Sequence, residues 1–189
     1  MTAKTAALLS DPHPNTHIVC PYGESHQMVT AVGHYVTEGI RRGESVVLII
    51  TEAHRSAVIT YLADAGFKPA ELGAEGRLLF LDAAALMENL FVENTPSPSA
   101  FEAIVGSAIR HPVAQAPSRK VRLYGDMVDQ LCGSGRDEAA VRIEELWKTL
   151  DEAQYVPVLC SYSLQRLQPL RDEIRERLLN VHSHQLALT

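Results

Sequence analysis

Lysine is absent between Lys4 and Lys68, and this gap covers the one segment that has the frame of a phosphate-binding loop. The segment reads HIVCPYGES, HQMVTAVGHYVTEGIRRGE and SVVLIITE, which predicts strand, tight turn, helix, glycine and strand, as in RecA-type ATPases. A P-loop needs G-x-x-x-x-G-K-[ST], because its glycines bring backbone N–H groups onto phosphates and its lysine reaches the terminal phosphates. The turn has a single glycine, Gly23, and it has Glu24 where phosphates would lie. The sequence therefore favours sensing or scaffolding over catalysis.

Aromatic residues, cysteines and long apolar runs are also scarce. Aromatics make up 6% of the 189 residues, so aliphatic side chains must fill the core. Cys20, Cys132 and Cys160 are far apart and form no C-x-x-C pair, which favours buried free thiols over a redox or metal role. No segment offers about 18 consecutive apolar residues, and the N-terminus lacks the h-region of a signal peptide. We therefore expect a soluble, cytoplasmic protein that does not contact a membrane.

Positive charge is limited too. The formal net charge is −6, and no basic stripe with interleaved aromatics is present. Direct nucleic-acid binding depends on such a stripe, so the sequence argues against it. At this length, a single α/β domain is the ordinary outcome.

The hydrophobic pattern predicts strands and helices in alternation. We expect a polar, mobile arm at 1–16, a single domain at 17–189, and flexible Pro-containing loops at 93–98 and 111–118. Right-handed crossovers between parallel strands place helices on both faces of a sheet. The prediction is a three-layer α/β fold with a mainly parallel sheet, RecA- or KaiC-like but without a functional P-loop. The five predicted strands are 17–20, 45–50, 78–81, 121–124 and 156–160.

Polar and aromatic side chains cluster in the sequence where the predicted strands end. Ligands of open α/β sheets bind outside the carboxyl ends of the strands, so these side chains are the candidate ligand-binding residues. Helix capping is a competing explanation for Ser25, Asp82 and Asp126. The candidates are Tyr22, Glu24, Ser25, His26, Thr51, Glu52, Asp82, Tyr124, Asp126 and Tyr162, with His54, Met127 and Ser161 beside them.

Other chemistries have weaker support in the sequence. Asp126 resembles the Mg²⁺-binding Asp of an ATPase, but the Lys and Ser/Thr partners are missing. Glu52, Asp82 and Asp126 could form a carboxylate metal site, although capping and exposure explain them more simply. The His182-Ser183-His184 tail offers two metal ligands, which do not make a site. There is no G-x-S-x-G nucleophile pattern. We expect no catalytic residues, no metal and no cofactor.

Nearly the whole chain, from His17 to about His184, resembles a MEDS domain, the sensory domain of the DcmR type found in methanogens and methylotrophs. The matching stretches are HIVCPYGES, EGIRRGESVVLIITEAHR, GRLLFLDAAALM, VRLYGDMVDQLCGSGRDEAAVRIEELWKTL, VLCSYSL and VHSH. The most specific of them begins RLYGDMVD, because it joins strand, turn and long helix with unusual residues at fixed spacing. The matching positions are Tyr22, Glu52, Asp82, Tyr124, Gly125, Asp126 and His182.

The resemblance implies a non-enzymatic signalling domain that senses small hydrocarbon derivatives or passes a signal to a regulator. DcmR-type transcription factors carry a helix-turn-helix, for which 1–16 is too short, so we expect a partner such as a histidine kinase or transcription regulator. Two alternatives stay open. The chain could be a pure protein–protein interaction module without a small ligand, or a residual nucleotide-binding, ATPase-like protein. A homodimer through Ile174, Leu178 and Val181 of the last helix is a further hypothesis; this stripe could equally close the core.

Overall fold

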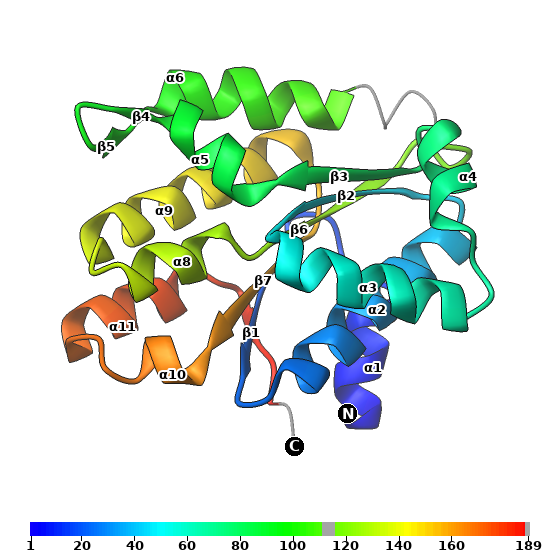
Figure 1. The fold of residues 1–189 in the computed structure, drawn as a ribbon, viewed down its shortest axis with the longest axis horizontal. Helices are drawn as coiled ribbons and strands as arrows, with labels where there is room; N and C mark the ends of the chain where they lie inside the picture. Colours follow the sequence, from blue (N-terminus) through cyan, green and yellow to red (C-terminus); the bar gives the residue numbers. More distant parts are fainter. Residues whose placement is uncertain (111–115, 188–189) are drawn as a thin grey trace.

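A six-stranded parallel sheet forms the centre of the protein (Figure 1). The computed structural model describes residues 1–110 and 116–187. Along the sheet the strand order is β3-β2-β6-β7-β1-β8, so β1 and β2 are separated by two strands. The strands are β1 (His17–Tyr22), β2 (Ser45–Ile50), β3 (Leu78–Asp82), β6 (Val121–Gly125), β7 (Val158–Ser163) and β8 (His184–Gln185). The predicted parallel α/β fold is confirmed.

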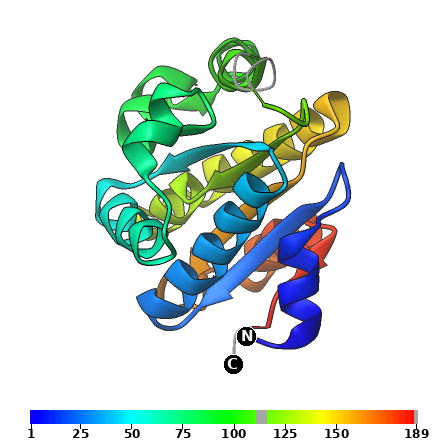
Figure 2. The same ribbon diagram turned by 90° about the vertical axis from the view of Figure 1, so that its right-hand side faces the viewer.

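Two helical layers cover the sheet, one on each face (Figure 2). The first layer comprises α1 (Ala3–Ser10), α2 (Ser25–Arg41), α3 (Glu52–Asp64) and α4 (Pro69–Ala74). The second comprises α5 (Ala83–Leu90), α6 (Pro98–Phe101), the π-helical turn η1 (Glu102–Gly106), α8 (Met127–Gly133), α9 (Asp137–Gln154), α10 (Leu164–Leu167) and α11 (Asp172–Asn180). The sequence-predicted three-layer arrangement is therefore observed.

Alternation along the strands divides the core between the two layers, since successive side chains of a strand point to opposite faces. In β1, Ile18 and Cys20 pack towards α2, whereas Val19 packs on the side of α9. In β7, Leu159 and Cys160 are divided in the same way. All six residues of β2 are buried, as expected of a central parallel strand covered on both faces.

The expected mobile arm differs from the structure, which has a helix there. Thr2 caps α1, and Leu9 is fully buried against the α2 side of the core. The buried Arg122 of β6 donates hydrogen bonds from Nη1 to the Leu9 carbonyl (3.1 Å) and the Tyr35 carbonyl (2.9 Å). These contacts tie the end of α1 to α2 and the sheet. The sequence of residues 1–16 could not reveal these hydrogen bonds, because their donor, Arg122, lies more than a hundred residues further along the chain.

Other segments show smaller differences from the predictions. The predicted loop at 93–98 contains one strand of a short antiparallel hairpin, β4 (Phe91–Val92) with β5 (Thr95–Pro96). The predicted loop 111–118 lies partly outside the described residues; within it, Ala116 is buried. Strand β8 adds a short edge to the five predicted strands. All three cysteines are buried and lie outside any disulfide, in agreement with the predicted buried thiols.

The last helix packs on its own domain. Ile174 and Leu178 are almost completely buried in the same core cluster as Trp147. Of the two explanations offered for its apolar stripe, the structure therefore favours closure of the core over a dimer contact.

Candidate functional site

A cleft of about 320 Å³ opens at the carboxyl ends of four neighbouring strands, β2, β6, β7 and β1. It lies between the turns that lead into α2, α3, α8 and α10, where the general rule for open α/β sheets predicts a ligand site. Its lining residues are Tyr22, Gly23, Ser25, Thr51, Ala53, His54, Asp126, Asp129, Gln130, Ser163, Gln165 and Arg166.

The turn from β1 to α2 forms one wall of the cleft. Two backbone N–H groups of this turn already donate hydrogen bonds within the protein. The Gln27 side-chain oxygen accepts hydrogen bonds from the backbone N–H groups of Gly23 and Glu24, both at 3.0 Å. These are amides of the turn that would face phosphates in a P-loop. The local sequence therefore caps the start of α2 from within, and it does not leave these two donors for an anion.

Asp126 forms the floor of the cleft and is 2% exposed. Its carboxylate accepts a hydrogen bond from the Thr51 backbone N–H (3.0 Å to Oδ1) and one from the Thr51 hydroxyl (2.9 Å to Oδ2). His54 Nδ1 donates to Oδ2 at 2.7 Å. Asp126 precedes α8, but no hydrogen bond from its side chain caps that helix. The carboxylate thus joins the ends of β6 and β2 instead.

Asp129 connects the other side of the cleft to β7. Its carboxylate accepts a hydrogen bond from the Ser163 backbone N–H at 2.9 Å and another from Arg166 Nη1 at 2.6 Å. Burial raises the pKa of Asp129, although Ser163 and Arg166 act against that shift. Arg166 remains 45% exposed in its side chain and reaches the cleft.

Tyr22 is the aromatic side chain of the lining and stands edge-on to His54, with ring centroids 6.2 Å apart. Burial raises the pKa of Tyr22 strongly, and the nearby Asp129 and Asp126 raise it further. The phenol therefore stays protonated and can donate a hydrogen bond. Gln130 offers a further donor: its Nε2 atom is buried and has no hydrogen-bond partner among the described residues.

The structure brings together four of the ten predicted ligand-binding residues, Tyr22, Ser25, Thr51 and Asp126. The other six do not line this cleft. Tyr124 and Tyr162 are buried in opposite core layers, where Tyr124 bonds to Ser161 (2.7 Å) and Tyr162 donates to Glu144. Asp82 caps α5, as the competing explanation predicts. The side chains of the remaining three are exposed: Glu24, His26 and Glu52.

Several lining residues were missed at the sequence level. Asp129 and Gln130 lie within one helical turn of Asp126, so their spacing was a usable signal. Ser163 is the last residue of β7, and Gln165 and Arg166 follow it; the end of this strand was predicted three residues too early.

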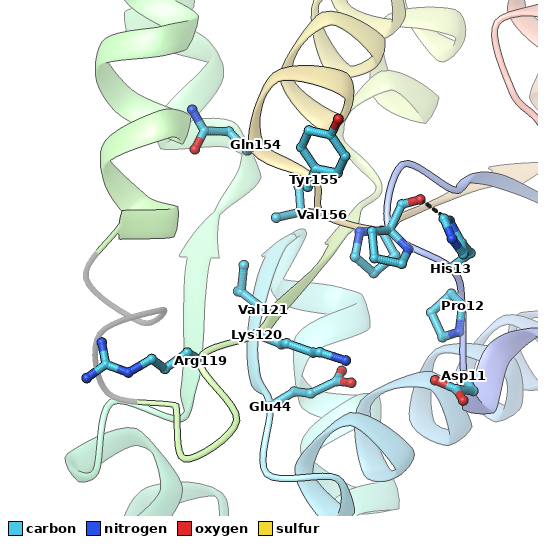
Figure 3. A pocket seen from close by; sticks show the side chains of 12 residues that line it. Asp11, Pro12, His13, Glu44, Arg119, Lys120, Val121, Gln154, Tyr155 and Val156 are labelled. Carbon is cyan, nitrogen blue, oxygen red and sulfur yellow. Dashed lines mark hydrogen bonds between the residues drawn. The ribbon is translucent and has the colours of Figure 1, made fainter.

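A larger cavity, of about 420 Å³, lies at the opposite edge of the sheet, before β6 and β7 begin (Figure 3). In Figure 3 the Lys120 side chain extends beside Glu44, and Tyr155 faces them across the hollow. His13 and the three prolines that share its lining form another wall. Because ligands of open α/β sheets bind at the carboxyl ends of the strands, we take the smaller cleft as the candidate site.

The predicted carboxylates Glu52, Asp82 and Asp126 do not converge on one point. Among residues 1–110 and 116–187, the group of three or more metal-binding side chains that does converge is His17, Glu144, Cys160 and His182. In the same part of the chain, no helix combines the length and the apolar character needed to cross a bilayer.

A comparison with known families places the chain beside a family of sensory domains. The family model described as "MEDS: MEthanogen/methylotroph, DcmR Sensory domain" matches residues 16–183, which is most of the chain. A comparison with curated proteins finds no match.

Proposed function

The chain belongs to the MEDS family of sensory domains, and from this we propose that it is a non-enzymatic signalling domain that binds a small, neutral, polar organic molecule in the strand-end cleft. The observation that carries the proposal is the buried, unpaired Nε2 of Gln130 in the lining. An unsatisfied buried donor costs free energy, so a ligand oxygen that accepts from it would be bound favourably.

The dimensions of the cleft support a small ligand. Its volume of about 320 Å³ is near the lower end of the usual range of about 300–1,000 Å³ for ligand sites. Tyr22 and Ala53 supply apolar surface, while Ser25, Gln165 and the exposed part of Arg166 supply hydrogen-bonding groups. This mixture suits a short carbon skeleton that carries an oxygen or a halogen, in agreement with the hydrocarbon derivatives implied by the family resemblance.

The charges of the cleft argue against a nucleotide. Asp126 and Asp129 place two carboxylates at the floor, and Arg166 is already paired with one of them. The amides of Gly23 and Glu24 are bonded to Gln27 and are not offered to phosphate. A RecA-like origin of the fold would fit this pattern, with the phosphate site replaced by a capped turn.

A second candidate function, docking of a signalling partner without a small ligand, is supported by a different surface. An apolar groove of about 720 Å³ runs along the edge strand β3, between α5 and η1. Leu79, Leu81 and Ile104 line it and are half-buried. Partly exposed apolar side chains beside an edge strand are typical of interaction surfaces.

A thermal-shift screen of the full chain separates these functions. It would use small oxygenated and halogenated organic compounds, Mg²⁺–ATP and divalent metals, on the wild type and on Gln130→Ala. Ligand at a hundredfold excess over Kd stabilises the folded state by about 2.7 kcal/mol, which raises the midpoint measurably. We expect small organic compounds to raise the wild-type midpoint, with a smaller rise for Gln130→Ala.

The matched control is Gln168→Ala, since Gln168 is exposed and lies outside the cleft lining. It should respond to ligand like the wild type. A shift with Mg²⁺–ATP that Asp126→Ala abolishes would instead support the nucleotide-binding alternative. No shift with any compound would favour the partner-docking function.

A further inference from the structure

Away from the cleft, four side chains that can bind a metal meet between the sheet and the α9–α11 layer. His17 begins β1, Cys160 lies in β7, Glu144 projects from α9, and His182 follows α11. One ligand atom from each side chain lies within 4.8 Å of all the others. The side chains of Glu144 and His182 are 0% exposed, and those of His17 and Cys160 are also buried.

Four distances between ligand atoms of this cluster match those of a tetrahedral metal site. Glu144 Oε2 lies 3.3 Å from His17 Nε2, 3.4 Å from His182 Nε2 and 3.7 Å from Cys160 Sγ. The His17 Nε2 to Cys160 Sγ distance is 3.3 Å. Zinc bonds of about 2.0–2.3 Å to nitrogen, oxygen and sulfur separate tetrahedral ligand atoms by about 3.3–3.7 Å. Four of the six pairs of ligand atoms thus have the separation that one ion requires, and all six lie within 4.8 Å.

The hydrogen bonds of His182 leave one ring nitrogen directed at the cluster. His182 Nδ1 is 2.8 Å from the Leu178 carbonyl oxygen, which can only accept, so Nδ1 carries the proton. With Nδ1 engaged in this hydrogen bond, Nε2 is the ring nitrogen that lies beside Glu144 Oε2, at 3.4 Å. Nε2 is buried and forms no hydrogen bond with any described residue. A metal ion between the two atoms would bind both of them.

The carboxylate of Glu144 is buried at the centre of the same cluster. Its side chain is 0% exposed, and Tyr162 donates a hydrogen bond to one of its two carboxylate oxygens. In the described part of the chain, the ion-pair partners of this carboxylate are two histidines, and neither Lys nor Arg is among them. A buried carboxylate is costly unless it is paired and hydrogen-bonded, and a bound metal ion is one such partner.

The surroundings orient the ligands as they do in known metal centres. The hydrogen bond from His182 Nδ1 to the Leu178 carbonyl fixes the tautomer that leaves Nε2 free to bind. The Tyr162 hydroxyl donates to the other carboxylate oxygen of Glu144, Oε1, which leaves Oε2 directed at the cluster. Both features correspond to the outer ligand contacts that stabilise zinc sites.

We propose that His17, Glu144, Cys160 and His182 bind one divalent transition-metal ion of the zinc class. The set of one thiolate, two imidazoles and one carboxylate suits zinc, with cobalt as a close mimic. Binding converts the Cys160 thiol to a thiolate and releases its proton to solvent. Four protein ligands leave no open coordination position, which is typical of a structural site. The ion would join β1, β7, α9 and the segment after α11, and thereby hold the C-terminal strand β8 against β1.

The test uses the full chain, stripped of metal with a chelator and titrated with Zn²⁺ or Co²⁺ alone. We expect one equivalent to bind, the thermal midpoint to rise, and the Co²⁺ form to show the intense visible bands of a tetrahedral site together with a thiolate-to-cobalt charge-transfer band. Because this experiment needs no substitution, a variant that fails to fold does not affect it.

Matched variants locate the ion. Cys160→Ser should lose the charge-transfer band, and His182→Gln should lose the tetrahedral bands. Cys20→Ser and His184→Gln should bind like the wild type, because Cys20 is buried on the other face of the sheet and His184 is exposed. Tyr162→Phe should keep the band but weaken Zn²⁺ binding by about 10–100-fold.

Three results would overturn the proposal. The first is a stripped wild type that binds neither metal. The second is a Co²⁺ spectrum without a thiolate band. The third is binding that persists unchanged in Cys160→Ser and His182→Gln, or that falls equally in Cys20→Ser and His184→Gln.

Discussion

His54 and Asp126 are joined by a hydrogen bond of 2.7 Å between Nδ1 and Oδ2, although they follow different strands of the sheet. Thr51 adds two further hydrogen bonds to the same carboxylate. Asp126 therefore links the β2–α3 turn to the end of β6 and shapes the floor of the cleft. Asp126 resembles the magnesium-binding aspartate of an ATPase, but in this structure its carboxylate holds two strand-end turns together by hydrogen bonds.

Replacing Asp126 with Asn should destabilise the protein in a way that Mg²⁺ does not affect. The amide has one acceptor where the carboxylate has two, and its NH₂ group would face the donors of Thr51 and His54. We expect a loss of about 1–3 kcal/mol in the free energy of unfolding, measured by urea denaturation. Glu52→Gln is the control, because Glu52 is exposed and should change little. Equal stability of Asp126→Asn and the wild type would contradict the assigned role.

Gly33→Ala should weaken the packing of α2 on α3. A Cβ at Gly33 would lie 2.3 Å from Cδ1 of Tyr61, and other atoms of that ring are also within 2.6 Å. Forced overpacking costs about 1–3 kcal/mol, which outweighs the gain in helix propensity from alanine. Gly73→Ala, in α4, is the matched control, because its Cβ would meet only the Leu78 carbonyl oxygen at 3.6 Å. The double variant Gly33→Ala/Tyr61→Ala should lose less stability than the two single losses added together.

Arg122→Met should be among the most destabilising single changes. Arg122 is 0% exposed, and its Nε donates to Glu44 Oε2 at 2.6 Å. Methionine leaves Glu44 without its partner and the carbonyls of Leu9 and Tyr35 without a donor. Removing one member of a buried pair costs about 3–5 kcal/mol. Arg171→Met, on an exposed arginine, is the control for chemical denaturation. A loss below about 1 kcal/mol would mean that Glu44 is rehydrated at the adjoining cavity.

The pH dependence of stability should report the burial of Asp129. Burial raises the pKa of Asp129 above its ordinary value of 3.8, so the folded state keeps this proton at a pH where the unfolded state has lost it. The contribution of Asp129 to stability is therefore greatest below the unfolded pKa and falls as pH rises through the folded pKa. Relative to Asp129→Asn, which has no such titration, the wild type should lose stability as the pH rises above 3.8 and through the raised pKa of the folded state. An opposite slope would show that Arg166 outweighs burial.

The repeating elements of this fold follow from the sequence because their signals are local. The continuous apolar run at Ser45–Ile50 and the helical stripe of Met28, Val32 and Val36 depend only on neighbouring residues, and both are observed. The short elements at the two ends of the chain, α1 and β8, could not be predicted in this way, because they depend on contacts with distant residues. Strand β8 contains two residues, and α1 is held by a donor from β6.

The site was only partly predictable because a strand end does not say where each side chain points. Tyr124 ends up beneath the cleft, bonded to Ser161, and Tyr162 turns to the opposite layer towards Glu144. Alternation along a strand is a local pattern that assigns each side chain to one face of the sheet, but it does not say which side chain reaches the cleft. By contrast, the meeting of His17 with Cys160 depends on the pairing of β1 with β7, which no local pattern specifies.

Backbone amide NMR with a compound that raises the thermal midpoint would show whether a small ligand binds at the strand ends. On titration of the isotope-labelled chain with that compound, we predict chemical-shift changes centred on Gly23, Thr51, Gln130 and Ser163, which surround the cleft. Changes centred on Lys120 and Tyr155, or on Leu81 and Ile104, would place the ligand in the opposite cavity or in the β3 groove and would contradict the account.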